Sequence, residues 1–173
     1  MEKLYPINVL VVEDSAFFRK TLKNMLESDP LIQVIGTAED GKEALEKIEK
    51  LRPDVVTLDI EMPRMNGLEV LKIVMEKFPL PVIMISSMTE EGAEATLDAL
   101  HMGAVDYISK NLSYMSSNIS AVRDELLAKV KAVAKKVTDS AVTNKFGASE
   151  SSCFERKIRS GNVFKNLRGS QPD

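Results

Sequence analysis

Five short apolar runs recur about every 25 residues through the first 137 residues of the chain, and they constrain the fold more than any other feature. The runs are residues 7–12, 32–37, 55–58, 82–85 and 105–108. Each is rich in Val or Ile and mostly unbroken, rather than alternating with polar residues. This pattern is typical of strands that are buried on both faces of a parallel sheet.

The stretches between these runs carry apolar residues at helical spacing. The clearest helix follows the last run, where one apolar stripe is formed by Ile119, Val122, Leu126, Val130, Val133 and Val137. Asp40 stands three residues before Glu43, and Asn66 three before Glu69, which predicts capped helix starts at both places. Successive strand–helix units form parallel sheets with helices on both faces, and five strands are too few for an eight-stranded barrel. We therefore expect an open, doubly wound α/β sheet.

The composition excludes several classes of protein. The chain has 173 residues, of which 44% are hydrophobic and 28% charged, as in ordinary globular proteins rather than disordered ones. A single cysteine, Cys153, allows neither a disulfide framework nor a cysteine-rich zinc site and favours a cytoplasmic location. The net charge of −3 argues against a dedicated nucleic-acid binder. The longest uncharged apolar stretch, residues 78–88, is too short to insert across a membrane.

The last 36 residues differ from the rest. From Thr138 onward the chain is rich in Ser, Asn and Gly and has no sustained apolar period. Its charge balance is +2, against −5 for the first 137 residues. We expect one folded domain over residues 5–137 and a flexible C-terminal tail over residues 138–173.

Acidic residues follow the first and third runs, at the edge of the sheet where open α/β folds bind ligands. Glu13 and Asp14 follow the first run, Asp59 follows the third, and Glu61 comes two residues later. If these two strands are neighbours, about 4.8 Å apart, the carboxylates converge. Each pair at ~4 Å would repel by on the order of 4 kcal/mol at an effective dielectric of 20. A hard cation such as Mg²⁺ would relieve that repulsion.

A hydroxyl and an ammonium group follow the remaining two runs. Ser86 comes after the fourth run, and Lys110 two residues after the fifth, so both would flank the acidic cluster. These groups donate charge-assisted hydrogen bonds to phosphoryl oxygens, and an Asp can accept a phosphoryl group covalently. The pattern indicates Mg²⁺-assisted phosphoryl transfer.

Four segments resemble the receiver domain of two-component response regulators. They are residues 9–15 (VLVVEDS), 54–63 (DVVTLDIEMP, followed by Asn66 and Gly67), 81–87 (PVIMISS) and 103–110 (GAVDYISK). The resemblance covers about residues 5–137 and implies the flavodoxin-like strand order 2-1-3-4-5 with a long C-terminal helix. Residues 57–63 and 87–96 are most similar to the receiver half of chemotaxis protein-glutamate methylesterases.

The resemblance implies a role for each acidic residue. Asp59 would be the phosphoacceptor. Asp14, Asp59 and the backbone carbonyl of Glu61 would bind Mg²⁺ directly, and Glu13 would act through water. Glu13 stands where the family usually has Asp, which leaves open the alternative of a pseudo-receiver that folds but is not phosphorylated.

The resemblance also implies partners and a switch. Lys110 would pair with the phosphoryl group, and Ser86 and Tyr107 would be switch residues, the hydroxyl turning toward the phosphate as the ring moves inward. The phosphoryl donor would be a sensor histidine kinase, of chemotaxis type if the methylesterase similarity holds. Output would pass through protein–protein contacts, without nucleic acid or membrane insertion.

We expect no enzyme activity beyond the chain's own phosphorylation and dephosphorylation. The tail holds Gly147-Ala148-Ser149 but lacks the glycines that follow in methylesterases, and His101 is the only histidine, so no Ser-His-Asp triad is expected. A fragment or degenerate form of a chemotaxis methylesterase stays an alternative. Other rivals are an aspartyl-phosphate phosphatase, whose usual Asp-x-Asp-x-Thr motif does not match residues 59–63, and a flavodoxin-like cofactor binder. Glu13 and Asp14 would repel the phosphate of such a cofactor.

Overall fold

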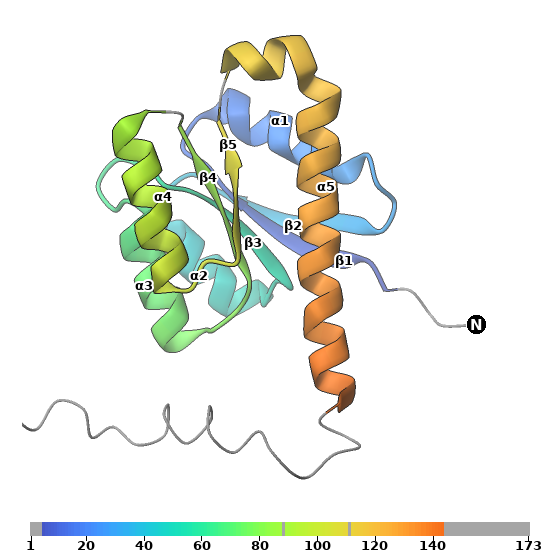
Figure 1. Cartoon of the computed structure of the whole chain (residues 1–173). Helices are drawn as coiled ribbons and strands as arrows, with labels where there is room; N and C mark the ends of the chain where they lie inside the picture. The colour runs from blue at the N-terminus through green and yellow to red at the C-terminus, as the bar shows by residue number, and fades with distance from the viewer. Residues whose placement is uncertain (1–4, 88, 111, 144–173) are drawn as a thin grey trace, which may run out of the picture. The chain divides into compact units, whose positions relative to one another are not determined.

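The computed structural model describes residues 5–87, 89–110 and 112–143. Contacts divide the chain into two units, Met1–Lys136 and Val137–Asp173. The first unit contains a five-stranded sheet and the helices that cover it (Figure 1). Of the second unit, the structure describes only the helical residues 137–143.

All five predicted strands form, and all pair in parallel. They are β1 (Ile7–Val12), β2 (Ile32–Ala38), β3 (Val55–Asp59), β4 (Val82–Ser86) and β5 (Asp106–Ser109). The sheet order is β2-β1-β3-β4-β5, which confirms the expected order. The carboxyl ends of β1 and β3 are therefore neighbours, with Val12 beside Leu58 in the register.

Within the described residues, five helices cover the two faces of the sheet. They are α1 (Ala16–Glu27), α2 (Gly41–Leu51), α3 (Gly67–Lys77), α4 (Glu90–Met102) and α5 (Leu112–Thr143). The expected caps are present: the Asp40 side chain accepts from the Glu43 N–H at 2.9 Å, and Asn66 forms a full capping box with Glu69. None of the described helices is apolar over a length that would cross a bilayer.

The core has two halves because side chains alternate along each strand. Val9 and Val11 of β1 pack with α1 and α5, whereas Leu10 and Val12 pack with α2, α3 and α4. Burial on both faces explains the unbroken apolar runs of the inner strands β1, β3 and β4, whereas the edge strands β2 and β5 are only partly buried. In the inner strands, burial leaves the strand ends as the places where polar side chains gather.

The stripe on the last helix is only partly as predicted. Val122, Leu126, Val130 and Val133 are buried, but Ile119 is 52% exposed. The backbone of Asn118 is not helical, with φ −137° and ψ 41°, so α5 is kinked just before Ile119. The turn before Asn118 therefore runs in a different direction from the rest of α5. The buried stripe of apolar side chains begins only at Val122.

The α5 helix also runs across the expected boundary between residues 137 and 138, to Thr143. The side chain of Val137 and the rest of the predicted tail, residues 144–173, lie outside the described part of the chain. The division into a receiver domain and a flexible tail therefore stays a prediction.

The loop after β3 folds back tightly on the strand. The Gly67 N–H donates to the Ile60 carbonyl at 2.9 Å, and a Cβ on Gly67 would lie 2.2 Å from the Asp59 carbonyl oxygen. Only glycine fits that close approach. The loop thereby fixes the backbone around Asp59.

Candidate functional site

Three carboxylates meet at the carboxyl ends of β1 and β3, as the sequence predicted. One ligand oxygen from each of Glu13, Asp14 and Asp59 lies within 4.8 Å of the others. Glu13 and Asp59 are fully buried, whereas Asp14 is exposed. The cluster thus opens to solvent on the Asp14 side.

Lys110 contributes the single ammonium group that contacts this cluster in the described structure. Its Nζ lies 2.7 Å from Glu13 Oε1 and 3.0 Å from Asp59 Oδ2. The Lys110 backbone N–H donates to the Ser86 carbonyl at 2.6 Å, which anchors the residue at the end of β4. The Nζ also lies 4.8 Å from the centre of the Phe18 ring on α1. One cation faces three carboxylates, so the pocket carries an excess of negative charge.

Burial perturbs the acids strongly. Desolvation raises the pKa of Glu13 from 4.5 to about 7, although the hydrogen bond from Lys110 opposes the shift. Desolvation likewise raises the pKa of Asp59 from 3.8 to about 6, against the charge of Lys110. Burial alone would lower the pKa of Lys110, but its hydrogen bond to Glu13 and the Asp59 charge outweigh burial and raise it. Lys110 is therefore a fixed cation, while the two buried acids titrate near neutral pH.

The donor set suits a hard divalent cation. Glu13 Oε2 is buried and has no hydrogen-bond partner within the described residues, so it has a free lone pair for a water or an ion. All candidate ligands are oxygens, as Mg²⁺ prefers. Asp59 Oδ1 accepts from the Glu61 N–H at 3.2 Å, and the Glu61 side chain accepts from the Ser87 hydroxyl at 2.6 Å. The backbone N–H of Glu61 therefore contacts the cluster, and the expected role of its carbonyl as a cation ligand stays a prediction.

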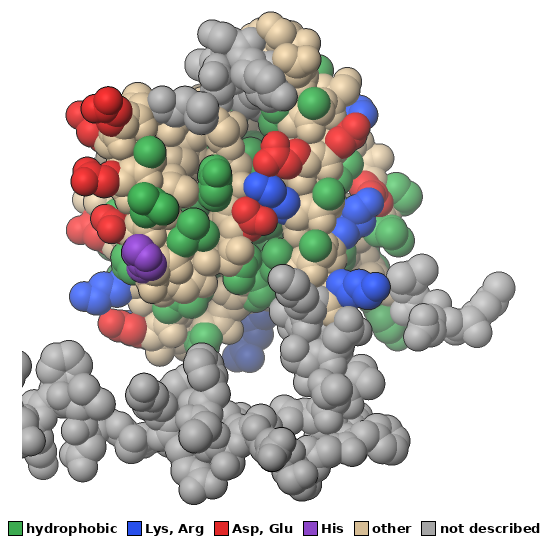
Figure 2. All heavy atoms as spheres, viewed as in Figure 1, with side chains coloured by type: hydrophobic (Ala, Val, Ile, Leu, Met, Phe, Trp, Pro, Cys, Tyr) green, Lys and Arg blue, Asp and Glu red, His purple; other side chains and the backbone are tan. Residues whose placement is uncertain are grey.

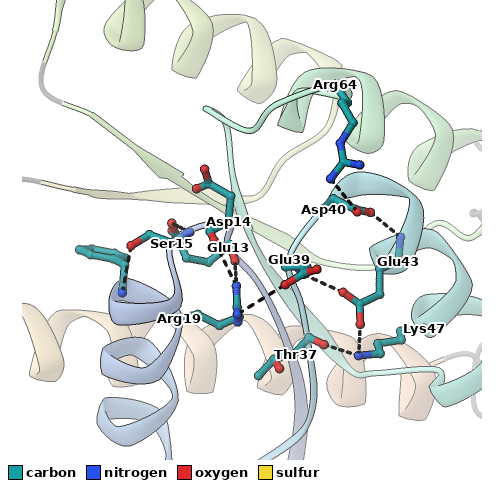
Figure 3. A network of polar contacts seen from close by, with 11 residues as sticks. Glu13, Asp14, Ser15, Arg19, Thr37, Glu39, Asp40, Glu43, Lys47 and Arg64 are labelled. Carbon is teal, nitrogen blue, oxygen red and sulfur yellow. Dashed lines mark hydrogen bonds and ion pairs between the residues drawn. The ribbon is translucent and has the colours of Figure 1, made fainter.

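The sequence did not indicate a role for Arg19, whose side chain donates hydrogen bonds to the backbone of the loop between β1 and α1. Its Nη1 donates to the carbonyls of Glu13 and Asp14, at 2.7 and 3.2 Å, and its Nη2 lies 3.8 Å from Glu39 (Figure 3). Figure 3 shows these residues leading into a chain of polar contacts that reaches Lys47. Arg19 stands one turn into α1, where an arginine is normally a surface residue, so only the fold reveals its role.

Ser86 and Tyr107 lie on adjacent strands but in different surroundings. The Ser86 hydroxyl is buried and contacts the Gly92 carbonyl at 2.9 Å and the Thr96 hydroxyl at 2.7 Å. Tyr107 is 44% exposed, and its ring lies 5.1 Å from the Lys129 ammonium. A cavity of about 340 Å³ is lined by both residues and by α4. Hydrophobic side chains lie exposed over α4 and β5 on this face of the molecule (Figure 2).

A comparison with known protein families shows to which family this fold and its acidic pocket belong. The model of the response regulator receiver domain matches residues 9–118. This chain belongs to the response regulator receiver family. Its three clustered carboxylates are typical of the magnesium site of receivers.

Among receivers, this one is similar to those of chemotaxis methylesterases. It is 58% identical over 129 residues to the protein-glutamate methylesterase/protein-glutamine glutaminase of Pyrococcus abyssi, covering 75% of this chain and 35% of that protein. The Symbiobacterium thermophilum protein of the same name is 60% identical over 129 residues, with 75% and 36% covered. The response regulator domain of Thermotoga maritima CheB is 51% identical, with a TM-score of 0.68, and 75% of this chain and 97% of that domain align.

The receiver aligns with only part of those enzymes. The chain spans about a third of the length of the curated relatives it matches, and their methylesterase domain lies outside the matched region. The similarity therefore concerns the receiver alone and points to chemotaxis signalling.

Proposed function

We propose that this receiver accepts a phosphoryl group on Asp59 from a sensor histidine kinase of chemotaxis type and signals through protein–protein contacts in the cytoplasm. The observation that carries the proposal is the buried Asp59 carboxylate, which lies 3.0 Å from Lys110 Nζ and within 4.8 Å of the Glu13 and Asp14 oxygens. The similarity to chemotaxis methylesterases supports the class of kinase. Neither nucleic acid nor membrane insertion has a part in the proposal.

Asp14, Asp59 and the backbone carbonyl of Glu61 would hold Mg²⁺, with Glu13 acting through a water molecule. The unpartnered Glu13 Oε2 supports this arrangement because a buried carboxylate oxygen is costly without a donor or an ion. When bound, Mg²⁺ supplies positive charge that offsets the carboxylates and lets an anionic phosphoryl group approach. A CheY in a complex with CheX, BeF₃ and Mg²⁺ from Borrelia burgdorferi is 37% identical, with 68% of this chain and 90% of that chain aligned at a TM-score of 0.57.

Asp59 would act as the nucleophile. One of its oxygens attacks the phosphorus of the phosphohistidine, a P–O bond forms, and the P–N bond to the histidine breaks. The carboxylate must be ionised for this step, and a pKa of about 6 leaves it mostly ionised above pH 7. Lys110 then donates to the phosphoryl oxygens from its position beside Asp59.

Ser86 and Tyr107 would convert phosphorylation into a change of surface. The Ser86 hydroxyl turns from the Gly92 carbonyl toward the phosphoryl group, and the Tyr107 ring turns into the cavity beside α4. The chain catalyses only its own phosphorylation and dephosphorylation in this proposal. A second candidate is the receiver part of a longer chemotaxis methylesterase, which the greater length of the relatives favours.

Intact-mass spectrometry with Mg²⁺ and a small phosphodonor tests the proposal. We expect one added phosphoryl group on the wild type and on Asp98→Asn, a control at an exposed position of α4. Labelling should vanish in Asp59→Asn and in the presence of a chelator. Labelling of Asp59→Asn at the wild-type level would refute the assignment, and an unlabelled wild type would identify a pseudo-receiver.

A further inference from the structure

The resting position of Ser86 is set by a buried triangle of oxygens at the start of α4. Ser86 Oγ lies 2.9 Å from the Gly92 carbonyl and 2.7 Å from Thr96 Oγ1, and Thr96 Oγ1 lies 2.6 Å from the same carbonyl. Ser86 is 3% exposed and Thr96 6%, so water does not compete for these bonds. Both hydroxyl hydrogens and the carbonyl are satisfied within the triangle.

The position of the Gly92 carbonyl is itself fixed. Gly92 lies in the first turn of α4, where its N–H is capped by Thr89 Oγ1 at 3.0 Å. A Cβ on Gly92 would lie 2.6 Å from both the carbonyl and the hydroxyl oxygen of Ser87. The first turn of α4 therefore lies so close to Ser87, just after β4, that there is no room for a side chain at position 92. The triangle is a rigid acceptor site for the Ser86 hydroxyl.

Thr96 gives this site two satisfied arrangements. In one arrangement, Thr96 donates to the Ser86 hydroxyl and Ser86 donates to the Gly92 carbonyl. In the other, Thr96 donates to the Gly92 carbonyl and Ser86 donates to the Thr96 hydroxyl. With Ser86 turned away, Thr96 still donates to the Gly92 carbonyl, four residues earlier on its own helix. After Ser86 turns away, the Thr96 hydroxyl and the Gly92 carbonyl are thus still paired with each other, so neither is left buried without a partner.

Thr96 also lines the cavity that Tyr107 borders, together with Leu97 and Leu100 of α4. A threonine presents a hydroxyl to Ser86 and a methyl group to an apolar surface. Valine has the same shape without the hydroxyl. A Thr96→Val substitution therefore removes the hydrogen bond to Ser86 while leaving the size of the cavity wall unchanged.

We propose that Thr96 is a positioning residue that holds Ser86 toward α4 in the resting state and so sets how readily the receiver switches. The proposal rests on the function proposed above for Ser86. Its physical content is the difference between two hydrogen bonds of Thr96. In the resting state the hydroxyl donates to Ser86, and in the switched state it donates instead to the Gly92 carbonyl, which the helical backbone pattern of α4 also pairs with an N–H. Because the second bond replaces only part of the first, removing the Thr96 hydroxyl shifts the resting equilibrium toward the switched state by less than one full neutral hydrogen bond would, about 2- to 3-fold.

Amide NMR of the full chain tests this, with the phosphodonor and Mg²⁺ defining the switched positions of the signals around Tyr107. Without phosphodonor, we expect Thr96→Val to move these signals part of the way toward the switched positions. Thr96→Ser keeps the hydroxyl and should restore the wild-type spectrum. In a Ser86→Ala background, Thr96→Val should have no such effect, because the residue it acts through is gone.

Three outcomes would overturn the inference: unmoved resting signals in Thr96→Val, the same movement in the Ser86→Ala background, or the same movement in Thr96→Ser. Thr96→Ala provides a second test should the valine variant not fold, and it must move the signals in the same direction. Failure of the proposed function itself is distinct, because the wild type would then gain no phosphoryl group by mass and its signals would not respond to the phosphodonor.

Discussion

Glu13 should make the metal-free protein less stable as the pH rises from 5 to 8. Burial raises the pKa of this carboxyl from 4.5 to about 7 in the folded state. The unfolded chain releases the same proton near pH 4.5. Between these values the folded state binds more protons, so the free energy of unfolding falls with increasing pH. This is the reverse of the acid denaturation expected for carboxyls in salt bridges.

The magnitude follows from the two pKa values. A single group that titrates at about 7 in the folded state and 4.5 in the unfolded state makes the protein about 2 to 3 kcal/mol more stable at pH 5 than at pH 8. Asp59, with a pKa of about 6, adds about 1 kcal/mol over the same range. Asp29 and Glu43 act in the opposite sense, because ion pairs with Lys131 and Lys47 lower their pKa values. Their stabilisation is lost only as the pH falls below about 4, outside this window.

Urea unfolding at a series of pH values, in the presence of a chelator, measures the effect. Glu13→Gln removes the titrating group and should abolish at least half of the pH dependence. Glu46→Gln, at an exposed position of α2, should leave it unchanged. The difference between variant and wild type cancels the titrating groups that do not interact with Glu13, and it includes any change that the substitution makes at Asp59 and Lys110. If wild type and Glu13→Gln show parallel dependences between pH 5 and 8, the argument from burial is wrong.

Mg²⁺ should reverse the trend, because metal ligands must be deprotonated. Stabilisation by Mg²⁺ is expected to be larger at pH 8 than at pH 5 and to be weakened in Asp59→Asn. Equal stabilisation of wild type and Asp59→Asn by Mg²⁺ would mean that the ion binds elsewhere.

Three further substitutions and one truncation test the fold. Arg52 ends α2 with a left-handed φ of 48°, so Arg52→Gly should stabilise the protein by about 1 kcal/mol and raise the melting temperature by a few degrees. Leu126→Ala on α5 should lower the free energy of unfolding by about 2–5 kcal/mol, because Leu126 is fully buried. Its control, Leu97→Ala at an exposed position of α4, should change the free energy of unfolding by about 0.5 kcal/mol or less. A chain that ends at Lys145 should melt within a few degrees of the full chain, as expected for removal of an undocked tail.

The sequence determined the number of strands, their parallel pairing and the helices between them. The reason is that these features depend on short-range patterns: unbroken Val- and Ile-rich runs, helical spacing, and the caps at Asp40 and Asn66. The sheet order came from the resemblance to receivers rather than from the periodicity. Within the last helix the apolar pattern was only partly right, since Asn118 has a non-helical backbone and the next residue, Ile119, is exposed.

The sequence also placed Glu13, Asp14 and Asp59 together, because carboxyl ends of neighbouring parallel strands meet at one edge of a sheet. Only the tertiary structure decided how these groups are charged. Glu13 pairs with Lys110, 97 residues away, and its burial raises its pKa to about 7. Desolvation depends on everything packed around a group, and no local pattern encodes it. The same holds for Thr96, whose hydrogen bond to Ser86 exists only because α4 packs against the end of β4.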